Sequence, residues 1–135
     1  MSSPSPSVPK RREIWLVNFD PTVGMEIRKT RPAVVVSSDA VGRLPIKLVA
    51  PLTDWKPRYA PNVWHVRIDP DPANGLAKPS AVDVLQLRGM DTVRFLQRLG
   101  SVPPDVMEEI VLAIPLNKLG RPAPHGSPPF YRALP

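Results

Sequence analysis

A short basic segment ahead of a run of valines contains the residue types that could act on a phosphate group. It covers residues 24–32 and combines one carboxylate with three cations: Glu26, Arg28, Lys29 and Arg31. Pro32 holds its own φ and biases Arg31 towards an extended conformation, so the guanidinium is placed at the rigid start of a strand. A planar, permanently charged group held in this way suits a phosphate. Charged loops are also common on protein surfaces, so the segment alone leaves both interpretations open.

Composition narrows the class of protein. The chain has 135 residues, which favours one small domain, and it carries a net charge of +6 with a pI near 10.2. Residues 26–58 hold seven Lys and Arg against three acidic residues. This excess predicts a polyanionic partner such as nucleic acid, with a generally solvated basic surface as the alternative. The absence of cysteine excludes disulfides and thiolate metal sites.

The two ends of the chain differ in composition from its middle. Residues 1–11 are rich in Ser and Pro with a basic end, and residues 120–135 are rich in Pro without an apolar repeat. We expect both to be disordered tails around one domain at 12–119. The apolar runs at 33–36 and 110–114 are too short to span a bilayer. We therefore expect a soluble, cytoplasmic protein without membrane contact.

The sequence of the domain predicts mainly β-structure. Six β-prone segments, separated by short loops rich in Pro, Gly, Asn and Asp, are 13–18, 32–38, 46–53, 63–69, 80–87 and 96–101. This spacing predicts a small antiparallel barrel or sandwich. Pro51 indicates an edge or a bulge in the third segment. In the fourth segment, alternation sets Val66 on one face and His65 on the other, so we expect His65 to point to solvent.

Only the end of the domain has a helical pattern. Residues 103–114 begin with prolines, carry acids in the first turns and place four apolar residues on one stripe, namely Val106, Ile110, Ala113 and Ile114. We expect Pro115 to end this helix. A single helical turn is expected around 91–95. The pattern therefore predicts a β-barrel with one C-terminal helix packed on it.

Several short motifs occur in the order seen in one known family. They are Arg11–Val17, Asp20–Gly24, Glu26, Lys29–Pro32 with its valines, Ala50–Thr53, Gln86–Arg88 and Leu99–Gly100. This ordered set resembles the MazF/PemK-type toxins, the endoribonuclease halves of toxin–antitoxin pairs, over roughly residues 11–114. The resemblance implies a small SH3-like antiparallel barrel of the CcdB/MazF type with one C-terminal α-helix. It also implies a homodimer that cleaves single-stranded RNA without a metal or cofactor and is inhibited by a cognate acidic antitoxin protein.

The resemblance also assigns roles to residues. The catalytic arginine of the family falls on Arg31, its catalytic threonine on Thr53, and a functionally important glutamate of some members on Glu26. The chemistry is reasonable, because metal-free cleavage by the RNA 2′-hydroxyl needs a proton acceptor and donors to the phosphoryl oxygens. Arg31 suits the stabilisation of phosphorane charge, Thr53 can donate one hydrogen bond, and Glu26 could accept the proton. Alternatively, Thr53 bonds its own backbone and Glu26 simply pairs with Arg28 or Lys29.

Further basic and polar residues flank these positions. We expect Arg28, Lys29, Lys56, Arg58, Gln86 and Arg88 to contact RNA. Trp55 and Tyr59 could stack on bases, or they could be half-buried loop residues. No cluster of metal-ligating residues is apparent in the sequence.

The chain departs from the family pattern at three positions. Arg12 stands where members commonly have glycine, Pro103 stands in place of the usual Ser or Thr helix cap, and Pro115 interrupts the last helix. Two other functional classes also remain open at this point. One is a CcdB-like poison that binds a topoisomerase without hydrolysing anything, and the other is a non-catalytic barrel that binds RNA or an acidic peptide.

Overall fold

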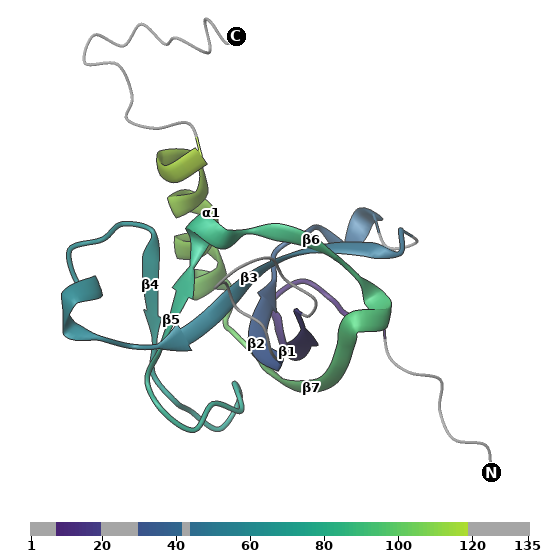
Figure 1. Ribbon diagram of the computed structural model, residues 1–135, viewed down its shortest axis with the longest axis horizontal. Coiled ribbons are helices and arrows are strands. Elements are labelled where there is room, and N and C mark those ends of the chain that lie inside the picture. Colours follow the sequence, from purple (N-terminus) through teal and green to yellow (C-terminus); the bar gives the residue numbers. More distant parts are fainter. Residues whose placement is uncertain (1–7, 20–29, 42–43, 119–135) are drawn as a thin grey trace, which may run out of the picture.

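The computed structural model describes residues 8–19, 30–41 and 44–118, and the fold is taken from these. Within them the chain forms seven strands and one α-helix (Figure 1): β1 Glu13–Asn18, β2 Thr30–Val35, β3 Ile46–Asp54, β4 His65–Ile68, β5 Ser80–Asp83, β6 Arg88–Asp91, β7 Phe95–Ser101 and α1 Pro104–Lys118. Four short 3-10 turns join them: η1 Asp39–Val41, η2 Pro57–Tyr59, η3 Val84–Gln86 and η4 Thr92–Arg94. The described helix is not long and apolar enough to cross a membrane.

All strand pairs are antiparallel and belong to one curled sheet. The strand order is β4-β5-β3-β2-β1-β7, and β6 pairs with β3 beside β5 (Figure 1). Residues 46–49 of β3 pair with β6 and residues 52–54 pair with β5. Pro51 lies in the gap between these two ladders, where its missing N–H breaks neither of them. The predicted mainly β fold with a C-terminal helix is confirmed, and the ladders among the described residues leave the sheet open.

Alternate residues of the strands face two hydrophobic clusters on opposite sides of the sheet. On one side α1 contributes Met107, Ile110 and Ala113, which pack on sheet residues Ile14, Val34, Val36, Ala50, Leu52, Val66, Ile68, Val82 and Val84. The cluster on the other side consists of Trp15, Val17, Phe19, Ala33, Val35, Val49 and Met90. We call this second side the open face. The odd-numbered residues of β2, β3, β4 and β5 point to it, because side chains alternate along a strand.

The loop between β4 and β5 packs against β7 through backbone contacts. The Ser101 amide donates to the Ala73 carbonyl at 2.9 Å. A Cβ atom added at Gly100 would lie 2.3 Å from that same carbonyl oxygen. Asn74 is buried and its Nδ2 donates to the Asp69 carbonyl at 2.8 Å. The glycine of the Leu99–Gly100 motif is therefore required by the close approach of two backbones.

Three elements differ from the sequence-based expectations. The strand predicted at 80–87 ends at Asp83, because the Asp83 Oδ1 accepts the Leu85 amide at 3.1 Å and caps a 3-10 turn. The chain then forms β6, a strand that was not predicted. The helix does not end at Pro115 but continues to Lys118. The packing of Ile110 and Ala113 on the sheet offsets the hydrogen bond lost at Pro115 and the clash of its ring with the preceding turn, so the helix continues.

The two remaining family departures are visible in the backbone. Arg12 has a φ of 77°, the left-handed region that favours glycine, and its guanidinium donates to the Val102 carbonyl at 2.7 Å. Pro103 precedes α1, and its carbonyl accepts the Met107 amide at 3.0 Å without any side-chain cap. Arg12 thus occupies a conformation that explains a glycine preference at this position.

Candidate active site

Arg31 and Thr53 lie on neighbouring strands and point to the open face. The β2–β3 ladder pairs Ala33 with Pro51. This is the last pair of the ladder, and Arg31 and Thr53 each lie two residues beyond it, at the same end of the two strands. On the other side of β3, Thr53 pairs with Ala81 of β5. Two residues that are distant in sequence therefore lie on the open face at the same end of two neighbouring strands.

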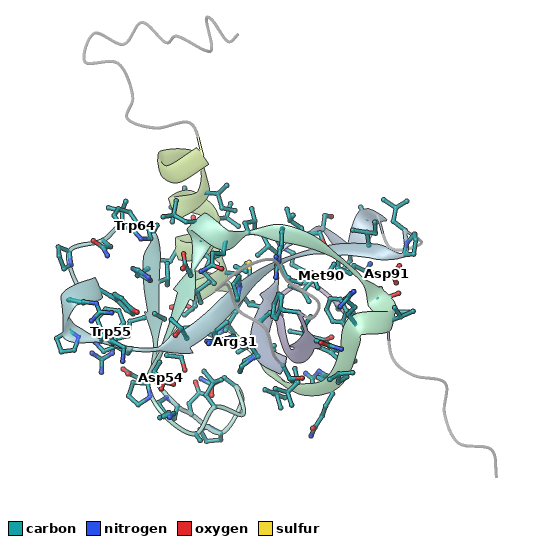
Figure 2. All side chains as sticks on the ribbon, viewed as in Figure 1. Arg31, Asp54, Trp55, Trp64, Met90 and Asp91 are labelled. Atoms are coloured by element: carbon teal, nitrogen blue, oxygen red, sulfur yellow. The ribbon has the colours of Figure 1, made fainter. Side chains whose placement is uncertain are left out.

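The side chains of Arg31 and Thr53 have no protein partner in the part of the chain that the structure describes. Neither the guanidinium nor the hydroxyl takes part in a hydrogen bond or ion pair there. Both residues are half-buried. In the view of Figure 2, Arg31 lies between Asp54, at the end of β3, and Met90 on β6. Their polar groups are thus available to a ligand that approaches the open face.

Arg88 adds a second guanidinium to this face. It pairs with Val49 across the β3–β6 ladder, and its guanidinium carbon lies 4.8 Å from the centre of the Phe19 ring. Phe19 follows the end of β1 that pairs with the start of β2, so Arg88 reaches towards the strand end that carries Arg31. The Arg88 Nε is buried and has no hydrogen-bond partner among the described residues. A buried donor without an acceptor is unfavourable, and an incoming oxygen would relieve this cost.

Gln86 is exposed, and Asp83 fixes the orientation of its amide. The Gln86 Nε2 donates to the Asp83 Oδ2 at 2.9 Å. An ionised carboxylate only accepts hydrogen bonds, so the amide nitrogen faces Asp83 and the amide oxygen remains for an outside donor.

The expectation that His65 points to solvent is met only in part, because its side chain is half-buried. His65 lies on the open face, opposite Asp83, as its alternation predicts. However, the η2 loop folds over it: the His65 ring stacks on Tyr59 with centroids 3.9 Å apart and an interplanar angle of 13°. The Asn62 Nδ2 lies 3.1 Å from the His65 Nδ1. Burial lowers the pKa of His65 below its ordinary value of 6.5, and the nearby Asp83 carboxylate opposes part of this shift.

The loop after β3 carries the predicted cations Lys56 and Arg58, both of which are exposed. The Arg58 guanidinium carbon lies 5.4 Å from the centre of the Tyr59 ring. Trp55 meets the same ring edge-on, with centroids 5.9 Å apart. Figure 2 shows Trp55 at the edge of the molecule, next to Asp54. The loop thus joins two cations and two aromatic rings to the end of β3.

Sequence reasoning missed two charged residues of the open face, Arg67 and Asp83. Arg67 pairs with Ala81, which in turn pairs with Thr53, so Arg67 and Thr53 stand in one row across three strands. The alternation of β4 set Arg67 away from the core but could not identify its neighbours. Only the strand register shows that it faces the same side as Thr53.

Three predicted residues, Glu26, Arg28 and Lys29, lie outside the described residues. Over the described ranges, no group of three or more His, Cys, Asp and Glu could hold a metal ion. The site is therefore defined by Arg31, Thr53 and the basic and aromatic groups around them.

A curled antiparallel sheet that presents cations, a hydroxyl and aromatic rings on the face away from its helix suits a single-stranded polyanion. The sequence matches, over residues 10–117, the family of PemK-like, MazF-like toxins of type II toxin–antitoxin systems. The chain belongs to this family.

Curated relatives and solved structures agree with this assignment. The chain is 35% identical over 106 residues to endoribonuclease PemK of Escherichia coli, covering 76% of each protein. The fold is similar to that of MazF from Deinococcus radiodurans, with a TM-score of 0.67 and 26% identity over 82% of this chain and 96% of that one. A MazE-MazF structure from the same organism gives a TM-score of 0.64 and 26% identity over 82% of this chain and 95% of that one.

Proposed function

We propose that this protein is the toxin of a toxin–antitoxin pair and acts as an endoribonuclease on single-stranded RNA. The observation that carries the proposal is the position of Arg31 and Thr53 on one face of neighbouring strands, with side chains that lack partners among the described residues. The family match and the named activity of PemK support an endoribonuclease over a CcdB-like topoisomerase poison.

The proposed reaction uses the RNA's own 2′-hydroxyl as nucleophile. Its oxygen forms a bond to phosphorus, the bond to the leaving 5′-oxygen breaks, and one proton passes from the 2′-oxygen to the 5′-oxygen. The products are a 2′,3′-cyclic phosphate and a 5′-hydroxyl. Arg31 holds the phosphoryl oxygens and stabilises the charge that gathers on them, because its planar guanidinium donates several hydrogen bonds to anionic oxygens. Thr53 donates one further hydrogen bond to the same oxygens.

We assign the proton acceptor to Glu26 and the substrate backbone contacts to five cations and one amide. These are Arg28, Lys29, Lys56, Arg58, Arg88 and Gln86. Among them, Arg88 has the strongest structural support, because its buried Nε lacks an acceptor within the described chain. A phosphate oxygen of the RNA would supply that acceptor.

The function is tested by incubating the purified full-length protein, free of any antitoxin, with labelled single-stranded RNA in excess EDTA. We expect cleavage to persist, and the fragments to carry a 2′,3′-cyclic phosphate and a 5′-hydroxyl. Loss of cleavage in EDTA with recovery on addition of Mg²⁺ would contradict the metal-independent mechanism. Absence of cleavage under every condition would contradict the endoribonuclease assignment.

We further propose that an acidic antitoxin segment binds the same basic face, because it presents the same charge as a phosphate chain. The MazE-MazF structure from Deinococcus radiodurans contains a structural relative of this chain together with a second protein, MazE. The interaction is tested by competition, in which an acidic antitoxin peptide should displace labelled RNA from the protein. A peptide that binds while RNA stays bound would place the antitoxin surface elsewhere.

We also propose that the protein is a cytoplasmic homodimer. Three alternate residues at the start of β3 are exposed: Leu44, which precedes the strand, and Ile46 and Leu48 within it, with 55%, 53% and 37% of their surface accessible. Burial of such a strip in a second copy removes apolar surface from water. Light scattering should give the mass of a dimer for the wild type and of a monomer for Ile46→Lys.

A further inference from the structure

Beyond the proposed catalytic residues, the open face carries a second feature at its β4 edge. Tyr59 contacts the rings of both Trp55 and His65, and the Arg67 guanidinium lies over the Trp55 ring. We call these four residues the aromatic ledge. None of the roles described above uses Arg67 or His65.

The contacts within the aromatic ledge are closely defined. The Arg67 guanidinium carbon lies 5.0 Å from the centre of the Trp55 ring, and its Nε donates to the Asp69 Oδ1 at 2.9 Å. The Trp55 amide donates to the Pro79 carbonyl at 3.0 Å, which fixes the Trp55 backbone next to the start of β5. Tyr59 supports Trp55 edge-on, with an interplanar angle of 83°. The indole and the guanidinium are therefore held in place before any ligand binds.

Two independent features connect the aromatic ledge to Thr53. Trp55 follows Thr53 by two positions in the chain, directly after β3 ends at Asp54. Arg67 stands in the same cross-strand row as Thr53, with only the small, fully buried Ala81 between them. Two strand spacings amount to about 10 Å. Figure 2 shows Asp54 between Trp55 and Arg31 in the same view.

We propose that Trp55 and Arg67 form a base-stacking subsite, which holds a nucleobase of single-stranded RNA next to the phosphate bound by Arg31 and Thr53. This inference rests on the proposed function and specifies how the substrate is held. Unpaired bases stack on aromatic rings and on guanidinium planes, and this stacking tolerates any base. Tyr59 and His65 act as positioning residues: Tyr59 contacts the indole edge-on, and His65 stacks on Tyr59.

The chain offers a matched control for Arg67. Arg98 on β7 also donates from its Nε to a carboxylate at 2.9 Å, and both arginine side chains have 48% of their surface accessible. The partner of Arg98 is Glu13, whose carboxylate also accepts a hydrogen bond from the Trp15 Nε1 at 2.9 Å. Within the described residues the Arg98 guanidinium lies over no aromatic ring, whereas that of Arg67 lies over Trp55. The two arginines thus match in their own exposure and in the length of the ion-pair contact, and they differ in ring contact, in location and in the exposure of the carboxylate, which is 64% for Asp69 and 16% for Glu13.

The experiment measures RNA binding in full-length protein carrying Thr53→Ala, so that the substrate stays intact. The probes are a fluorescein-labelled single-stranded RNA of mixed sequence and an abasic ribose-phosphate chain of the same length. We expect Trp55→Ala to weaken RNA binding by about 10-fold while the abasic chain binds almost as before. Arg67→Lys keeps the charge but loses the planar group, so we expect a loss of several-fold for RNA only. Arg98→Lys should change neither.

Several outcomes would overturn the subsite. They include equal losses for RNA and the abasic chain, wild-type binding by Arg67→Lys, and a defect of Trp55→Ala that is confined to an acidic peptide. If Trp55→Ala lowers the melting temperature, Trp55→Phe and Arg67→Lys carry the test. Binding and cleavage are measured separately, so the two proposals can fail separately. If the Thr53→Ala protein binds RNA in a base-dependent way but the protein with Thr53 cleaves no RNA, the endoribonuclease is refuted and the subsite is supported. If RNA is cleaved but binding does not depend on the bases, the endoribonuclease is supported and the subsite is refuted.

Discussion

Arg31 and Thr53 lie at the same end of the adjacent antiparallel strands β2 and β3, on the face of the sheet opposite α1. The hydroxyl and the guanidinium come from adjacent strands, each two residues beyond the last pair of the β2–β3 ladder, so both are carried by strands and not by a loop. This relationship makes the first prediction specific.

Replacing Arg31 or Thr53 by alanine should each lower RNA cleavage by at least ~10²-fold, the scale for removing one donor to a developing oxyanion. Thr53→Ser keeps the hydroxyl and should retain most activity. Thr92→Ala serves as control, because Thr92 is also half-buried but lies on η4. Initial cleavage rates and circular dichroism check the result, and wild-type rates in both alanine variants would remove the site assignment.

The cations of the η2 loop should determine part of the salt dependence of RNA binding. If Lys56 and Arg58 each neutralise one phosphate, the double alanine variant should flatten the slope of log affinity against log salt by roughly 1.4. Lys10→Ala combined with Arg98→Ala removes the same charge elsewhere and should leave the slope nearly unchanged. Fluorescence anisotropy at a series of salt concentrations measures both. Equal flattening in the two double variants would indicate a non-specific charge effect.

His65 should make the protein less stable as the pH falls. Its folded-state pKa lies below the ordinary value of 6.5, so the unfolded chain binds the proton more readily than the folded chain does. Well above pH 6.5, His65 does not change the free energy of unfolding. As the pH falls from 6.5 towards the lower, folded-state pKa of His65, the free energy of unfolding decreases. Urea unfolding of wild type and His65→Gln between about pH 5 and pH 8 tests this. A variant with an unchanged pH slope would rule out His65 as its origin.

Gly100→Ala should destabilise the fold, because the added Cβ would lie 2.3 Å from the Ala73 carbonyl oxygen, which is backbone. We expect a loss of about 1–3 kcal/mol in the free energy of unfolding. Gly89→Ala is the matched control, since its Cβ would only approach an Ile46 side-chain atom at 3.0 Å. Urea midpoints at constant m-value measure the difference. Similar losses at both positions would argue against the backbone contact.

Arg12→Gly should be more stable than Arg12→Ala. Both variants lose the hydrogen bond to the Val102 carbonyl, but only glycine adopts a φ of 77° without a steric cost. The expected difference is about 1 kcal/mol in the free energy of unfolding. Thermal and urea unfolding compare the pair directly. Equal stability would mean that the backbone at this position relaxes at no cost.

The local patterns of the sequence determined most of the secondary structure and the candidate residues themselves. Alternation in β4 and the valine run of β2 set their buried faces, and the stripe from Val106 to Ile114 set the packed side of α1. The ordered motifs around Arg31 and Thr53 led to the correct family. These features depend on residues that are close in the chain, so they can be read without knowing the fold.

Only the tertiary structure decided which of these residues meet. The sequence does not predict β6, because a strand of four residues containing Gly89 has little hydrophobic periodicity of its own. This strand forms by pairing with β3. His65 was assigned to the correct face but the wrong surroundings, since the η2 loop that covers it comes from elsewhere in the chain. Arg67 joins the row of Thr53 through the β4–β5–β3 register. Such contacts depend on cross-strand pairing between distant segments, which local periodicity does not encode.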